Sequence, residues 1–149
     1  MEIKSVIGKH RRIMFDTAPI VYFIEENKDF SNITDEIFKL INDPHGYYYP
    51  FSSVITLIEV LTQPFKKSRM DLVKKYREFL LNASNFTIYS IDPIVAEKAA
   101  ELRAQYAIKT QDAIQLAVAI ENNATLFITN DKELKRIKEI EVLVLAEYM

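Results

Sequence analysis

Short, continuously apolar segments that alternate with helical segments constrain the fold of this 149-residue chain more than any other feature. The clearest are residues 12–15 (RIMF), 125–129 (TLFIT) and 142–145 (VLVL). Strands of this kind are buried on both faces, as in parallel sheets that helices cover on each side. The pattern predicts a three-layer α/β/α domain with a parallel sheet, and ligands bound beyond the carboxyl ends of its strands.

Periodicity and turn-forming residues predict the remaining elements. Two more strands are expected within 47–54 and 86–91, and helices are expected over 19–24, 34–41, 55–63, 72–80, 93–106, 112–121 and 132–140. Pro64 is expected to stop a helix, whereas Asp92 and Thr110 are expected to cap the starts of two others. Because no repeat or flexible linker interrupts the chain, residues 1–149 are expected to form one domain, with 1–12 as a lead before the first strand.

The scarce residue types exclude several chemistries. The chain has no Cys, two Gly and two His, His10 and His45, both of which are expected at the surface. Disulfides, cysteine-ligated metals, glycine-rich phosphate loops and three-histidine zinc sites are therefore excluded. A net charge of −2, with no signal peptide and no apolar run of ~20 residues, favours a cytoplasmic protein without membrane association. Any chemistry is expected to depend on carboxylates, hydroxyls, Lys, Arg or Tyr.

Four acidic residues stand where this fold places a ligand site. Asp16 directly follows the first strand, and Asp131 follows the 125–129 strand one residue later. Asp112 falls in the first turn of the most apolar helix, and Glu59 lies about one and a half turns into the helix after the second strand. Because carboxyl ends of parallel strands meet at one edge, these side chains are expected at the same edge.

Each acid also has a purely structural role open to it. Asp16 and Asp131 are favoured N-caps, and Asp112 gains from the dipole of its helix. Glu59 could belong with Thr56 to a thin polar stripe that contact with solvent explains. If the four instead converge, their repulsion requires a hard divalent cation, Mg²⁺ or Mn²⁺, with oxygen ligands. Such an ion activates water and stabilises charge on a phosphoryl group.

Four segments together resemble the PIN-domain family, and within it the small VapC-type toxins of toxin–antitoxin pairs. They are FDT at 15–17, SVITLIEV at 53–60, TQDAIQLA at 110–117 and ITND at 128–131, in family order within residues 13–145. The resemblance implies a five-stranded parallel sheet and a Mg²⁺-dependent endoribonuclease that hydrolyses RNA phosphodiester bonds. It also implies a homodimer and a cognate antitoxin protein.

The same resemblance implies roles for individual residues. The family's acidic residues match Asp16, Glu59, Asp112 and Asp131, of which the aspartates hold the metal and the glutamate often reaches it through water. Thr129 matches a frequent Ser or Thr, whose hydroxyl orients water or a carboxylate. Thr17 is expected to support Asp16 through its hydroxyl or its backbone.

An RNA substrate requires cations near the acidic cleft, because phosphate contacts dominate affinity. The candidates in loops or beside the last acid are Lys66, Lys67, Lys132 and Lys135. Lys74 and Lys75 are expected on a solvated helix face.

Two functions other than a nuclease match part of this pattern. A PIN fold kept as an RNA- or protein-binding module without catalysis remains open, although the presence of all four acids argues against it. An aspartyl-nucleophile phosphatase needs a second Asp two residues after Asp16, and this chain has Ala18 there.

Overall fold

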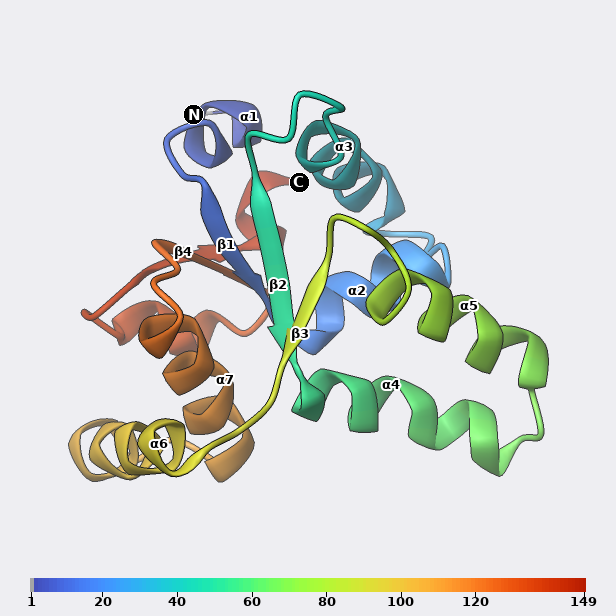
Figure 1. The fold of residues 1–149 in the computed structure, drawn as a ribbon. Helices are drawn as coiled ribbons and strands as arrows, with labels where there is room; N and C mark the ends of the chain where they lie inside the picture. Colours follow the sequence, from blue (N-terminus) through green and yellow to red (C-terminus); the bar gives the residue numbers. More distant parts are fainter. Residues whose placement is uncertain (1) are drawn as a thin grey trace.

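A five-stranded parallel sheet forms the centre of the protein in the computed structural model, which describes residues 2–149 (Figure 1). Its strand order is β3–β2–β1–β4–β5, and every neighbouring pair is parallel. The strands are β1 (Arg12–Phe15), β2 (Tyr49–Ser53), β3 (Thr87–Tyr89), β4 (Leu126–Thr129) and β5 (Glu141–Val144). The predicted parallel sheet and the five strands implied by the family resemblance are both confirmed.

Helices cover both faces of the sheet. The α-helices are α1 (Ile3–Ile7), α2 (Thr17–Ile24), α3 (Ser31–Ile41), α4 (Val54–Lys66), α5 (Met70–Leu80), α6 (Pro93–Tyr106) and α7 (Thr110–Glu121), and the 3₁₀ helices are η1 (Lys132–Arg136) and η2 (Leu145–Tyr148). The first five α-helices contribute to the core on one face, and α6 and α7 to the core on the other. Among the described residues, every helix is too short or too polar to cross a membrane.

The apolar run of β1 is explained by burial on both sides. Ile13 and Phe15 belong to the core beneath α2 and α3, whereas Met14 belongs to the core beneath α6 and α7. All three are fully buried, and the Phe15 ring stacks on Phe38 of α3 at 4.8 Å between centroids. Successive residues of a strand face opposite sides, so a strand with helices on both sides must be apolar throughout.

The strand order reverses direction beside β1. The chain runs from β1 to β2 and β3 on one side, then crosses to β4 and β5 on the other. The carboxyl ends of β1 and β4 therefore meet at this switch point, where the backbone N–H of Asp16 donates to the carbonyl of Ile128 at 2.9 Å. Ligand sites in open α/β sheets lie at such points.

Pro64 does not end its helix, contrary to the sequence-based expectation. The helix α4 continues to Lys66, and Pro64 is buried in its last turn. A proline there removes only one backbone hydrogen bond, and the N–H of Lys67 still reaches the Gln63 carbonyl at 3.0 Å. The burial of the ring offsets the loss.

Two other expected boundaries are wrong. The segment expected as a helix over 132–140 is helical only in η1. The backbone of buried Ile137 is extended, and residues 138–140 form bends before β5. Lys109, rather than Thr110, is the N-cap of α7.

The residues before β1 are more ordered than a simple lead. They contain α1, and His10 is only 8% exposed rather than at the surface. Its Nδ1 lies 2.8 Å from Thr125 Oγ1 and its Nε2 lies 3.3 Å from Glu141 Oε1. The Thr125 hydroxyl satisfies Nδ1, whereas the buried Nε2 makes no hydrogen bond and has the Glu141 carboxylate as its polar neighbour.

Candidate active site

Asp16 lies at the centre of the acidic edge. Its Oδ1 accepts hydrogen bonds from the Thr17 backbone N–H at 2.8 Å and from Gln115 Nε2 at 3.4 Å, and its Oδ2 accepts one from Thr129 Oγ1 at 2.8 Å. Burial raises the pKa of Asp16, these three hydrogen bonds lower it, and the charge of Glu59 raises it. The net shift is upward, so the site disfavours the bare carboxylate.

Glu59 is linked to Asp16 through hydrogen bonds to Thr17. The Thr17 hydroxyl donates to Glu59 Oε1 at 2.6 Å, while its backbone N–H donates to Asp16. The expected support of Asp16 by Thr17 is therefore made by the backbone, and the hydroxyl holds the other acid. Thr56, expected beside Glu59 in a solvated stripe, is fully buried instead.

Asp112 is the acid on which the charges of the other three act. Its pKa is raised to about 6, first by burial and then by the charges of Asp16, Asp131 and Glu59, while Lys109 acts in the opposite direction. The carboxyl group is half-buried in the first turn of α7. Burial is the largest cause of the shift, and repulsion from the other acids adds to it.

Asp131 stands at the rim of the candidate site, directly after Asn130, which follows the last residue of β4. Its Oδ1 accepts from the Glu133 N–H at 3.0 Å, so it caps η1, and its own N–H donates to Thr129 Oγ1 at 3.1 Å. Asp16 likewise caps α2. The capping role and the convergence on one site are thus compatible, because both strands end where helices begin.

A hollow of about 380 Å³ opens between these elements. It is lined by three of the acids and by residues of α2 and α7, namely Asp16, Thr17, Ala18, Val21, Tyr22, Glu59, Gln111, Asp112 and Gln115. It therefore lies at the carboxyl end of β1, where the strand order switches, while Asp131 stands outside its lining.

The donor set fits a hard divalent cation. Within residues 2–149, no three acidic or histidine side chains are already grouped closely enough to hold a metal ion, so binding requires the carboxylates to draw together. Their oxygens are the ligands that Mg²⁺ and Mn²⁺ prefer. A positive charge would also relieve the repulsion that raises the pKa of Asp112.

The model of the PIN domain matches residues 13–140 of this sequence. The chain belongs to the PIN-domain family. Comparison with curated proteins gives no match.

Solved structures share this PIN fold. VapBC2 from Rickettsia felis, bound to a DNA fragment from its promoter, contains a chain with 23% identity and a TM-score of 0.72, covering 89% of this chain and 98% of that one. A toxin–antitoxin complex from Klebsiella pneumoniae gives 22% identity and a TM-score of 0.67, covering 89% and 96%. A chain in DNA-bound VapBC from Salmonella typhimurium is 21% identical with a TM-score of 0.68, and the match covers 91% of this chain and 98% of that one. At these identities the likeness establishes the fold.

The four candidate lysines of the PIN domain differ in their surroundings. Lys132 is exposed directly after Asp131, whereas Lys135 pairs with Glu147 at 2.9 Å. Lys66 and Lys67 lie at the far end of α4, ~10 Å beyond Glu59 along the helix axis. The sequence interpretation missed Lys109, whose charge acts on Asp112 directly.

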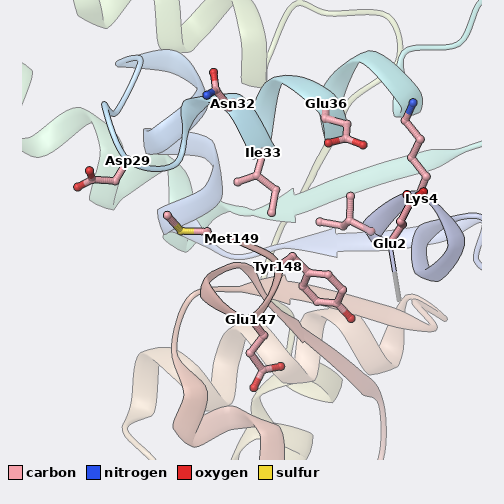
Figure 2. Close-up of a pocket in the computed structure, with 10 residues that line it drawn as sticks. Glu2, Lys4, Asp29, Asn32, Ile33, Glu36, Glu147, Tyr148 and Met149 are labelled. Carbon is pink, nitrogen blue, oxygen red and sulfur yellow. The ribbon is translucent and has the colours of Figure 1, made fainter.

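A larger hollow of about 1010 Å³ lies elsewhere in the PIN domain, between α1, α3 and η2 (Figure 2). Its polar lining is mainly acidic, with Glu2, Asp29, Glu36 and Glu147 against Lys4. None of the four acids of the switch point lines it, so size alone does not locate the candidate active site.

Proposed function

We propose that this PIN domain is a Mg²⁺- or Mn²⁺-dependent endoribonuclease and the toxin of a toxin–antitoxin pair. The observation that supports the nuclease activity is the convergence of Asp16, Glu59, Asp112 and Asp131, expressed in the raised pKa of Asp112. The nearby charge of Lys109 lowers the pKa of Asp112, yet the net shift remains upward. A divalent ion supplies further positive charge, activates water and stabilises the phosphoryl group during hydrolysis.

The residues of the chain have distinct tasks in this proposal. Asp16, Asp112 and Asp131 hold the ion, and Glu59 reaches it through water. Thr129 and the Thr17 backbone keep the Asp16 oxygens pointing in fixed directions. Asp112 is ionised above about pH 6 and so supplies a full negative charge to a cation at neutral pH.

The substrate side depends on cations beside the acids. Lys132 is the best placed of the predicted lysines, because it is exposed and adjacent to Asp131. Lys135 is already paired with Glu147, and Lys66 and Lys67 would contact only the more distant part of an RNA strand. Phosphate contacts of this kind make binding strongly salt-dependent.

The test is cleavage of a structured, end-labelled RNA by the purified chain. Reactions contain Mg²⁺, Mn²⁺ or EDTA, and the variants are Asp16→Asn, Asp112→Asn and the matched control Asp35→Asn on the exposed face of α3. We expect cleavage with either metal, loss with EDTA and in the two site variants, and full activity in the control.

Two outcomes would contradict the proposal. Cleavage that persists in EDTA and in both site variants would exclude the metal–carboxylate mechanism. Failure to cleave any RNA, together with no measurable Mg²⁺ or Mn²⁺ binding, would favour a PIN fold that acts only as a binding module.

The toxin assignment is supported by the likeness to chains of VapBC and other toxin–antitoxin complexes. We propose that a cognate antitoxin, encoded by a small neighbouring reading frame, binds this chain and blocks the acidic hollow. Co-expression of the antitoxin should restore growth to cells that the chain alone arrests. Growth arrest that co-expression does not relieve would contradict the antitoxin proposal.

We also propose that the chain forms a homodimer. Sedimentation velocity should give the mass of two chains, and a single-chain mass at micromolar concentration would contradict the dimer.

A further inference from the structure

Gln115 is an amide buried in the otherwise apolar helix α7. Only 1% of it is exposed, and it lies among Ala113, Leu116 and Ala117, which are fully buried. A polar group in such a place is destabilising unless its hydrogen bonds are made within the protein. The hydrogen-bond partners of Gln115 therefore show which side chains it can position.

The amide has a single orientation that satisfies its partners. Its Oε1 accepts from Ser53 Oγ at 2.5 Å, and its Nε2 donates to Thr56 Oγ1 at 2.8 Å and to Asp16 Oδ1 at 3.4 Å. Turning the amide over would set Oε1 against the carboxylate of Asp16, with no proton between them. The Asp16 carboxylate, which only accepts, thus fixes which end of Gln115 faces the acid, and the Ser53 hydroxyl donates to the other end.

The contacts continue from Gln115 to the second acid. Thr56 Oγ1 lies 3.1 Å from Thr17 Oγ1, and the Thr17 hydroxyl donates to Glu59 Oε1 at 2.6 Å. The Ser52 hydroxyl donates its one proton to the Phe15 carbonyl at 2.7 Å. Its oxygen, 2.8 Å from Thr56 Oγ1, therefore shares with Thr17 Oγ1 the single proton of Thr56. One connected network therefore links α7 and β2 to two of the four acids.

We infer that Gln115 is a positioning residue that aims Asp16 and, through Thr56 and Thr17, Glu59 for divalent-ion binding. This inference rests on the proposed function, because it requires that the acids bind a metal. The buried amide reduces the freedom of two carboxylates that repel each other, and so lowers the cost of bringing them together around an ion. Partners that orient metal ligands affect metal affinity ~10- to 100-fold.

The first experiment removes the amide donor without changing the size of the side chain. Mn²⁺ binding is measured by titration calorimetry in the absence of RNA for the unaltered chain, Gln115→Met and the control Gln105→Met. Gln105 is an exposed glutamine of α6. We expect Gln115→Met to bind Mn²⁺ about 10- to 100-fold more weakly and the control to bind it unchanged.

The second experiment separates hydrogen bonding from packing at Thr56, in case Gln115→Met fails to fold. Thr56→Ser keeps the hydroxyl and loses a methyl group, whereas Thr56→Val keeps the shape and loses the hydroxyl. If Thr56 transmits orientation, the Ser variant retains Mn²⁺ affinity and the Val variant loses it. A role in packing alone predicts the reverse order.

The outcomes distinguish this inference from the proposed function. Equal Mn²⁺ affinity in the unaltered chain and Gln115→Met, or better binding by Thr56→Val than by Thr56→Ser, would overturn the positioning role alone. Absence of Mn²⁺ binding by the unaltered chain would overturn the proposed metal-dependent function and this inference with it.

Discussion

The hydroxyl of Thr129, the last residue of β4, donates a 2.8 Å hydrogen bond to Oδ2 of Asp16, the residue after β1. The two strands are neighbours in the sheet, so this bond ties together the two elements that end in acids. It stabilises the ionised form of Asp16 and opposes the effect of burial, which raises its pKa. Thr129 is fully buried, so water cannot replace the bond.

Replacing Thr129 should therefore affect stability as well as activity. We expect Thr129→Val to lower the free energy of unfolding at pH 7.5 by about 1–3 kcal/mol, since a buried hydrogen bond to a charged group is lost. Urea unfolding measures the change. Thr129→Ser keeps the hydroxyl and should lie closer to the unaltered chain; a Ser variant that is less stable than the Val variant would contradict this.

Asp112 should make the metal-free protein less stable as the pH rises. Its folded-state pKa of about 6 exceeds the ordinary value of 3.8, so folding favours the protonated form, and that advantage is lost as the pH rises through 6. We expect Asp112→Asn to be about 1 kcal/mol more stable than the unaltered chain at pH 8, once solvent screening of this half-buried group is allowed for. The difference should vanish near pH 4.

Asp71 provides the matched control for that measurement. It also lies in the first turn of a helix, but Arg69 lowers its pKa to about 2 through hydrogen bonds at 2.9 and 3.0 Å. Asp71→Asn should therefore give no gain in stability at pH 8. A gain equal to that of Asp112→Asn would show that the pH effect does not arise from the acidic site.

Divalent metal should stabilise the folded chain. At a concentration 100 times its dissociation constant, an ion that binds only the folded state adds about 2.7 kcal/mol. Thermal unfolding with Mn²⁺ should show a higher midpoint at pH 7.5, a smaller shift at pH 5, where Asp112 is protonated, and none with EDTA. An equal shift in Asp16→Asn and Asp112→Asn would place the ion elsewhere.

Lys132 should contribute to RNA binding through phosphate. Fluorescence anisotropy with RNA in EDTA, at several salt concentrations, should show that Lys132→Ala lowers the slope of log affinity against log salt by ~0.7. Lys135→Ala should change it less, because Glu147 competes for that side chain. The exposed Lys75 of α5 is the control, and an equal effect of Lys75→Ala would exclude a specific contact of Lys132.

The fold could be predicted from the sequence because burial on two faces leaves a clear pattern. After Arg12, every residue of β1 is apolar and buried. Asp92 followed by Pro93 marks the start of α6 at the observed residue. The meeting of Asp16 with the end of β4 follows from parallel pairing alone. The wrong boundary at Pro64 also has a physical reason. Pro64 is tolerated inside α4 because it lies in the last turn and is buried, and local helix propensity does not indicate its burial.

The hydrogen-bond network around Gln115 could not be predicted from the sequence. Gln115 does stand out as an amide within the apolar part of α7, three residues after Asp112, a spacing that puts both on one face. Its partners Ser53 and Thr56 come from distant parts of the chain, and only the tertiary structure pairs them with it. The sequence did point to Thr17 and Thr129, which hydrogen-bond Asp16, but it did not point to Lys109 or to the buried partners of Gln115.

The pairing of Ile13 in β1 with Leu126 in β4 has a consequence for how this molecule is made. Because synthesis proceeds from the N-terminus, β1 leaves the ribosome long before the strand that must lie beside it, and this closure of a long loop comes late in folding. A ribosome-bound fragment that ends before β4 lacks Asp131 and the partner of Asp16. The four acids can therefore come together only after β4 and the residues that follow it have been synthesised.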